Sequence, residues 1–232
     1  MAHRRKNNTT KLEIIQVASR LFLERGYSKT SIKAIADELD ISTGHLMFYF
    51  PTKEHLLAVL VRMLCDFQWR MMQNKVQEGN TSVMALCLEL MTMAAMCEDD
   101  EVAKDFYISA YTRPLTLEII RKNDAERAQM IFAQYCPDWE HHHFTEAEIL
   151  VSGIEYTTLM TAGEPVPLDI RIAGALNSIL MTYNVPEEIR RMKIGKILAM
   201  DYRELGKRVL NEFRHYVEET NEQAFEDLLN QR

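Results

Sequence analysis

The sequence predicts an all-α protein in which a small N-terminal helical unit precedes a larger helical part. Apolar residues recur along most of the 232-residue chain at the spacing of one helix face. Helix-capping residues and breaks rich in Gly and Pro separate these stretches. The alternating pattern of a half-buried strand is not convincing in any segment. We therefore expect two helical domains, over residues 9–56 and 57–232.

The first expected helix begins near Thr10 and ends at Arg25. Thr10 and Glu13 have the spacing of a capping box, in which a hydroxyl and a carboxylate satisfy free backbone N–H groups. The core positions follow at helical spacing, namely Ile14, Ala18, Leu21 and Phe22. Gly26 can adopt the left-handed conformation that ends a helix.

Two shorter helices, joined by a tight turn, are expected next. Thr30 or Ser31 can cap the first of them, and Ser42 can cap the second. The first buries a stripe made of Ile32, Ile35, Ala36 and Leu39. The second buries Leu46 and Phe50, and its other face carries Thr43, Gly44, His45, Met47 and Tyr49. A face that has no acidic residue and a glycine in its first turn can approach a base edge or a phosphate closely.

Three helices of this size, with the last one presented outward, follow the helix-turn-helix plan. Helical spacing alone is also compatible with a small bundle that binds no nucleic acid. In residue type and in spacing, however, residues 9–58 resemble the DNA-binding domain of TetR-type transcriptional regulators. The positions that carry this resemblance are Ala18, Leu21, Phe22, Gly26, Tyr27, Thr30, Ser31, Ile35, Ala36, Ile41, Ser42, Gly44, Leu46, Tyr49, Phe50, Lys53 and Leu56.

The resemblance implies which residues contact DNA. They are Thr30, Ser31, Lys33, Ser42, Thr43, Gly44, His45, Met47, Tyr49 and Lys53. Base edges are expected to meet Thr43, Gly44 and His45. Phosphates are expected to meet Thr30, Lys33, Tyr49 and Lys53. The family usually has tyrosine where this chain has Met47, which removes one expected phosphate-contacting hydroxyl.

The charges of the chain are distributed unevenly. The formal net charge is −7, yet residues 1–55 contain nine basic and six acidic residues, which leaves 18 basic and 28 acidic residues for the remainder. A basic head on an acidic body is the asymmetry expected when only the head meets phosphate. An arm ahead of the first helix carries His3, Arg4, Arg5, Lys6 and Lys11. Away from DNA we expect this arm to be disordered.

The C-terminal part reads as a series of helices. They are expected over residues 52–76, 82–96, 98–110, 114–134, 145–162, 168–183 and 187–219. The whole chain has fourteen methionines, and many of them lie in this part. They either fill a core or line an adaptable cavity for an apolar ligand. TetR-type proteins usually hold an effector among these middle helices. The candidate lining residues are Met91, Phe106, Tyr107, Tyr111 and Tyr156.

Dimerisation is implied because a single helix-turn-helix contacts few bases, whereas two related by a two-fold axis read paired half-sites. TetR-type proteins dimerise through two late helices, for which the candidates here lie around residues 146–162 and 168–183. The second carries an apolar stripe that suits an interface or the core of the chain equally well. This stripe contains Ile172, Leu176, Ile179, Leu180 and Tyr183.

Other classes of function find little support in the sequence. His141–His143 could bind a transition metal, but consecutive histidines cannot all point one way on a helix, and we expect a polar loop and no metal. No phosphate-binding loop or nucleophile motif is recognisable, so neither an enzyme nor a cofactor is expected. The four cysteines lack metal or redox spacing and are expected to be buried thiols. Without a long apolar run or a secretory signal, the expected location is the cytoplasm, with no membrane partner.

Together these features predict a ligand-responsive transcriptional regulator. We expect a repressor that binds a palindromic operator in double-stranded DNA as a homodimer and is released by a small-molecule effector. The alternative is a helical metal- or small-molecule-binding protein that does not bind DNA.

Overall fold

A computed structural model describes residues 2–77, 81–161 and 165–230 of the chain. In these ranges it contains twelve α-helices and no strand, which confirms the all-α prediction. The N-terminal helices are α1 (Ala2–Arg25), α2 (Ile32–Glu38) and α3 (Thr43–Tyr49), and we call them the head. The long helix α4 (Lys53–Gln77) leads from the head into the rest of the chain.

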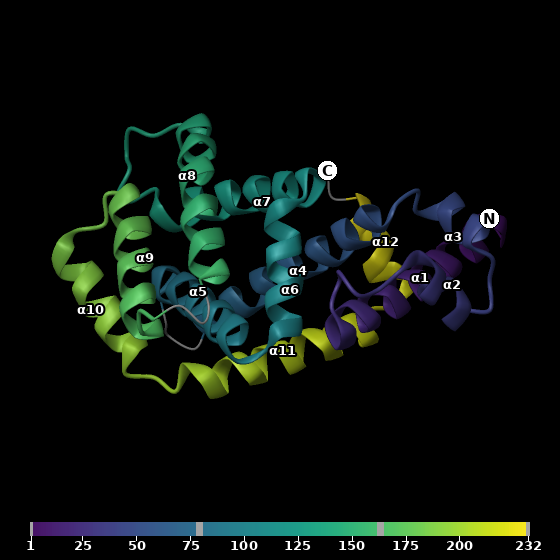
Figure 1. The fold of residues 1–232 in the computed structure, drawn as a ribbon. Coiled ribbons are helices and arrows are strands. Elements are labelled where there is room, and N and C mark those ends of the chain that lie inside the picture. Colours follow the sequence, from purple (N-terminus) through teal and green to yellow (C-terminus); the bar gives the residue numbers. More distant parts are fainter. Residues whose placement is uncertain (1, 78–80, 162–164, 231–232) are drawn as a thin grey trace.

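The remaining helices form the larger part of the molecule. They are α5 (Ser82–Asp99), α6 (Glu101–Thr112), α7 (Pro114–Phe132), α8 (His141–Met160), α9 (Leu168–Thr182), α10 (Glu187–Leu198), α11 (Tyr202–Glu219) and α12 (Glu222–Asn230). We call α5–α10 the body. The molecule is elongated, with the head at one end and α8–α10 at the other (Figure 1). Helix α11 runs beneath the body to the head, where α12 packs on α1 and α4 (Figure 1).

The head owes its stability to a local apolar core. The side chains of Phe22, Ile35 and Leu46 come from its three helices and are fully buried. Gly26 ends α1 with φ at +93°, in the left-handed region that favours glycine. The sequence pattern of this unit is therefore reproduced in three dimensions, because each helix buries the stripe that its spacing predicts.

Two expected helix starts are wrong. Helix α1 begins at Ala2, so Thr10 and Glu13 lie inside it and the basic residues ahead of Thr10 continue the helix. No proline or glycine stands among them to stop it. Helix α8 begins at His141 rather than Thr145, because Glu140 and His143 form a capping box there. His141–His143 are consequently the first turn of a helix and not a loop.

The expected helix over residues 187–219 is also wrong, because the chain forms α10 and α11 with a break between them. Asp201 caps α11 by accepting a hydrogen bond from the backbone N–H of Glu204 at 3.2 Å. The break lets α11 turn back along α5. At the crossing, a Cβ added to Gly206 would lie 3.1 Å from the Thr92 carbonyl oxygen, so the two helices approach closely.

The predicted breaks at residues 78–80 and at Gly163 lie outside the described residues. The division of the chain at residue 56 stays a prediction. Within the part of the chain that the structure describes, no helix is long and apolar enough to cross a membrane. All four cysteines are buried and free, as the sequence predicts.

Candidate nucleic-acid interface and body cavity

Serine caps fix the two short helices of the head. The Ser31 hydroxyl accepts a hydrogen bond from the Ala34 N–H at 3.1 Å, and the Ser42 hydroxyl accepts one from the His45 N–H at 3.1 Å. Each serine is extended and satisfies a backbone group that would otherwise lack a partner in the first helical turn. In the DNA-free head both residues therefore have a structural role.

The outward face of α3 is open to solvent. Thr43, Gly44 and His45 are exposed, and Met47 has 47% of its surface accessible. Tyr49 is half-buried and packs edge-to-face on the His45 ring, with 5.4 Å between ring centroids. This face contains no acidic side chain, so it can approach DNA without charge repulsion.

Phe48 is a candidate contact residue that the sequence interpretation missed. Its ring is 77% exposed, more than any other large apolar side chain in the described part of the chain. The adjacent Met47 is exposed as well, so the two side chains give the outer part of α3 an apolar surface. The signal was present in the sequence, because Phe48 lies two positions from the buried Leu46 and so faces away from it.

The structure contradicts a phosphate contact by the Thr30 side chain. Thr30 is buried, and its hydroxyl donates to the carbonyl oxygens of Gly26 at 2.8 Å and Leu21 at 3.2 Å. The hydroxyl instead ties the start of α2 to the end of α1. Sequence spacing alone does not show this, because a cap position can face either solvent or the core.

Lys53 also points inward. Its ammonium donates to the carbonyl oxygens of Tyr27 and Thr30, both at 3.0 Å, and lies 4.1 Å from the centre of the Tyr27 ring. Partial burial lowers the pKa of Lys53. By contrast, Lys33 is exposed, and among the described residues it pairs only with Asp37, at 2.6 Å on the next turn of α2. Lys33 is thus the more available of the two cations for a phosphate.

The turn after α1 docks on the body. Asp105 of α6 accepts hydrogen bonds from the Ser28 N–H, at 2.8 Å, and from the Ser28 hydroxyl. Nearby, the Glu54 carboxylate accepts a hydrogen bond from the Leu115 N–H at 3.0 Å, at the start of α7. The first contact joins α6 to the head, and the second joins α7 to the start of α4, directly after the head. A shift of α6 would therefore reach the head directly, and a shift of α7 would reach it through α4.

A cavity of about 500 Å³ lies between α4, α5 and α11. Of the five residues predicted to line a ligand site, only Tyr107 lies in its wall. Met91 and Phe106 are buried core residues, and the Tyr111 hydroxyl donates to Glu155 at 2.9 Å. Tyr156 is half-buried on α8 and packs against the core. The sequence interpretation missed the contribution of α11, because that helix is distant in sequence from the others.

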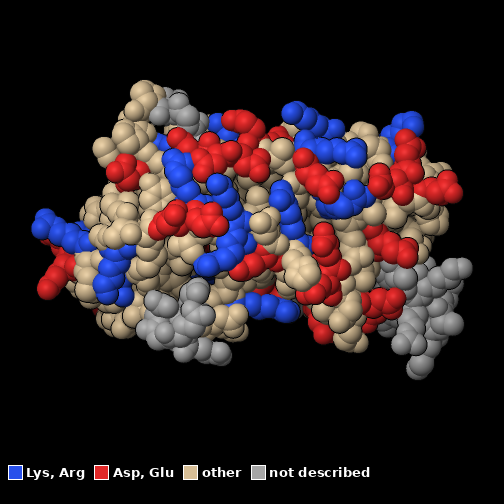
Figure 2. Space-filling model, turned by 90° about the horizontal axis from the view of Figure 1, so that it is seen from below, with Lys and Arg blue, Asp and Glu red and all other residues tan. Residues whose placement is uncertain are grey.

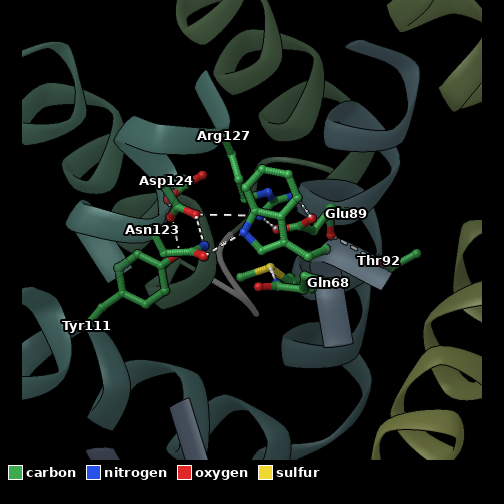
Figure 3. A network of polar contacts seen from close by, with 10 residues as sticks. Gln68, Glu89, Thr92, Tyr111, Asn123, Asp124 and Arg127 are labelled. Atoms are coloured by element: carbon green, nitrogen blue, oxygen red, sulfur yellow. Dashed lines mark hydrogen bonds and ion pairs between the residues drawn. The ribbon is translucent and has the colours of Figure 1, made fainter. Parts of the chain in front are cut away.

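A polar network crosses the interior beside this cavity (Figure 3). The Arg127 guanidinium pairs with both oxygens of Glu89 and lies 3.4 Å from Asp124. Asn123 donates to Asp124 at 2.9 Å and accepts from the Trp69 indole N–H at 2.9 Å. Burial raises the pKa of Asp124 to about 6, although the Arg127 charge opposes that shift. The network joins α4, α5 and α7.

Two further carboxyl groups lie on α8 near this network. Burial raises the pKa of Glu148 to about 8 and holds the pKa of Glu155 well above its usual range. Glu148 hydrogen-bonds the Tyr183 hydroxyl through one oxygen, while its other oxygen has no partner among the described residues. The interior therefore favours carboxyl groups that keep their protons.

The histidine cluster is engaged locally. His143 accepts the Glu140 backbone N–H at 3.0 Å, and His141 lies 3.0 Å from the Gln129 side-chain oxygen. Across the described residues, no three His, Cys, Asp or Glu side chains are gathered as metal ligands would be.

The apolar stripe predicted on the helix over 168–183 belongs to the core of the chain. Ile172, Leu176 and Ile179 are at most 1% exposed. A different face of α8 and α9 is open and apolar, and its exposed residues are Ile149, Leu150, Met160, Ile170 and Met181. Gly153 and Gly174 are exposed on the same helices, and a Cβ added to either would meet no atom within 4 Å.

Comparison with known proteins identifies the head. Residues 14–60 match the family model described as bacterial regulatory proteins, tetR family. The head is thus similar to the N-terminal region of TetR-family regulators. The match covers most of α1, all of α2 and α3, and the start of α4, so it includes the two serine caps and the open face of α3. The body lies outside the matched residues.

Curated relatives match part of the chain. The HTH-type transcriptional regulator HbdR of Aromatoleum sp. (strain CIB) is 28% identical over 110 residues, which are 47% of this chain and 47% of HbdR. The probable HTH-type transcriptional regulator YttP of Bacillus subtilis (strain 168) is 40% identical over 53 residues, or 23% of this chain and 26% of YttP. The chain thus spans less than half the length of these relatives.

Among solved structures, one match is the TetR family protein CprB from S. coelicolor A3(2). It is 21% identical with a TM-score of 0.45, and the comparison covers 90% of this chain and 99% of CprB. A repressor is also among the curated relatives, since the HTH-type transcriptional repressor KstR2 of Mycobacterium tuberculosis (strain ATCC 25618 / H37Rv) is 33% identical over 60 residues. Those residues are 26% of this chain and 30% of KstR2.

Proposed function

We propose that this TetR-type chain is a cytoplasmic DNA-binding transcriptional regulator that acts as a homodimer and responds to a small-molecule effector. The observation that supports this proposal most strongly is the face of α3 that is open to solvent and has no acidic side chain. It lies within the part of the chain that matches the TetR family model. We propose that it represses transcription, as the name of the relative KstR2 says of that protein. No enzymatic step is part of the proposal.

In this proposal α3 enters the major groove. Thr43, Gly44 and His45 meet base edges, and Phe48 makes an apolar contact of the kind that thymine methyl groups accept. Lys33 and the basic residues at the start of α1 meet phosphates, which position the helix without reading sequence. Lys53 does not contact DNA in this proposal, and its ammonium holds the turn before α2 in place through the Tyr27 and Thr30 carbonyl oxygens.

The open apolar face of α8 and α9 is proposed to pair with a second copy of the chain. Pairing would cover Leu150 and Ile170, which are 65% and 60% exposed, and the exposed glycines would let backbones approach closely. A two-fold dimer places two heads on half-sites about 34–36 Å apart, one helical turn of DNA or a multiple of it. The operator is therefore expected to be palindromic.

An effector changes the regulator only by binding one dimer geometry more tightly than another. In the proposed mechanism, the effector-bound geometry moves the two heads away from the half-site spacing. The contacts of Asp105 with Ser28 and of Glu54 with Leu115 are the routes by which α6 and α7 reach the head. DNA is then released.

The DNA proposal is tested by selecting binding sites from genomic fragments and measuring affinity against salt concentration. We expect an enriched inverted repeat and a steep salt slope, because phosphate contacts release counterions. His45→Ala should change the preferred sequence. Lys33→Ala should weaken all duplexes about equally and flatten the slope. Enrichment of no sequence, with no salt dependence, would favour a helical ligand-binding protein that does not bind DNA.

The dimer proposal is tested by the mass in solution. Leu150→Glu together with Ile170→Glu should convert dimer to monomer in light scattering and abolish operator binding. Met130→Glu is the matched control, because Met130 is 69% exposed but lies on α7. If the control variant dissociates instead, the interface lies elsewhere.

A further inference from the structure

The cavity between α4, α5 and α11 opens to solvent where Arg208 and Glu212 lie, and it is too large to be a packing defect. Protein interiors are close-packed, and the voids in them rarely exceed the size of a water molecule. A volume of about 500 Å³ falls in the range of sites that hold small molecules. Leu64 and Met72 of α4, Leu88 of α5 and Val209 and Phe213 of α11 are among its lining residues.

Methionines give the cavity adaptable walls. Met71 and Met72 come from α4, Met84 and Met93 from α5, and Met200 from the break before α11. A methionine side chain has three rotatable bonds and a polarisable sulfur, so it fits an apolar surface of variable shape. The sequence alone leaves the methionines divided between core and cavity. The structure places these five at the cavity.

Tyr107 is a buried polar group in a mainly apolar wall that also contains Gln68, Asn74 and Thr92. Its side chain is 3% exposed and lines the cavity, and its hydroxyl has no hydrogen bond to another described residue. On the next turn of α6, Tyr111 is also buried, but its hydroxyl donates to Glu155 at 2.9 Å. Burial raises the pKa of Tyr107, so the group stays a neutral donor. At the cavity wall this hydroxyl is free to donate to a ligand, and an acceptor on the ligand would give it a hydrogen bond.

The charges at the wall are already balanced. Glu89 is committed to Arg127, which pairs with both of its oxygens. Arg208 and Glu212 lie 3.7 Å apart with more than half of each side chain exposed, so they face solvent. On the face seen from below, acidic and basic side chains are interspersed (Figure 2). The cavity therefore offers no unpaired charge to an ionic ligand, and burying such a ligand there would be unfavourable.

We propose that this cavity binds a neutral, largely apolar molecule that carries a hydrogen-bond acceptor, and that Tyr107 donates to that acceptor. The role of this ligand as an effector rests on the proposed function. The binding of the ligand is a separate property that can be measured without DNA. The occupant touches α11, whose Arg214 donates to the Leu23 carbonyl oxygen of α1 at 2.8 Å. The proposed ligand therefore contacts α11, the same helix that is hydrogen-bonded to α1 of the head.

Binding is tested on the full chain without DNA, so its outcome is independent of operator recognition. The probe is the neutral fluorophore N-phenyl-1-naphthylamine, displaced by four competitors with nine-carbon chains. These are methyl nonanoate, nonane, nonanoate and nonylammonium. We expect the ester to displace the probe best, with nonane about tenfold weaker, the difference made by one hydrogen bond. Nonanoate and nonylammonium should be weaker than the ester.

Variants locate the site. Tyr107→Phe should weaken the ester about tenfold and leave nonane unchanged, because only the hydroxyl is removed. Tyr111→Phe is the matched control and should leave the ratio of ester to nonane unchanged. Leu88→Trp should fill the cavity and abolish probe binding, and Val209→Trp should do the same from α11 if Leu88→Trp does not fold. An unchanged ratio in Tyr107→Phe, a preference for either ion, or probe binding that survives a folded tryptophan variant would each overturn the proposal.

Discussion

The head and the body of this chain are both helical, yet they place their polar groups differently. In the head, polar side chains satisfy backbone groups near them in sequence, as Ser31, Ser42 and Thr30 do. In the body, charged groups pair across helices, as Arg127 of α7 does with Glu89 of α5. Local capping is encoded in short motifs, whereas interior pairing depends on how distant helices come together. This contrast predicts how each region responds to change.

Removing the central cation should give the largest effect. Arg127→Leu leaves Glu89 and Asp124 without their partner in the interior, and we expect a loss of about 3–5 kcal/mol in the free energy of unfolding. Urea unfolding measures it. Adding Glu89→Gln to Arg127→Leu should recover part of the loss, because one stranded charge is then removed. Equal stabilities for the single and double variants would show that charge is not the cause.

Gly26→Ala should have the next largest effect, at the boundary between the regions. Alanine is strained at φ +93°, and its Cβ would lie 2.8 Å from an Asp105 carboxylate oxygen. We expect a loss of about 1–3 kcal/mol in thermal or urea unfolding. Asp105→Ala also removes the Ser28 hydrogen bonds, so it serves as the reference: Gly26→Ala should cost less in the Asp105→Ala chain than in the native chain, because only the backbone strain remains.

The body should lose stability as pH rises, whereas the head has no comparable buried acid among its described residues. Glu148 is protonated more readily in the folded state, since its pKa of about 8 exceeds the ordinary value of 4.5. Glu148 in the folded state therefore holds an extra proton between these values, and this group lowers stability across that window by at most about 1.4 kcal/mol per pH unit. Urea unfolding from pH 5 to 9 measures the slope. Glu148→Gln should flatten it, and an unchanged slope would contradict the assignment.

Phe48→Ala should have the smallest effect on stability and a larger one on DNA. The ring is 77% exposed, so the free energy of unfolding should change by less than about 0.5 kcal/mol. The variant should discriminate less between an operator and the same site with thymine replaced by uracil, which lacks the methyl group. Fluorescence anisotropy with both duplexes checks this, and equal discrimination in both proteins would remove Phe48 from the interface.

Much of the head could be predicted from the sequence, because its determinants are local. The Ser31 and Ser42 caps, the buried stripe around Ile35 and the left-handed Gly26 each depend on residues within a few positions. The orientation of Lys53 and Thr30 could not be predicted. Both reach into the turn after α1, and only packing decides whether a side chain at a helix start faces solvent or that turn.

For the chain as a whole, the sequence by itself determined the all-helical class, the TetR-type head and the outward face of α3. Those features follow from periodicity and capping, which act within one or two helical turns. Only the tertiary structure decided that Ile172 and Leu176 are core while Ile170 and Leu150 are open, and that α11 closes a cavity against α4 and α5. The physical reason is that the burial of a residue depends on which helices pack against its own. That packing is determined by contacts between residues far apart in the sequence.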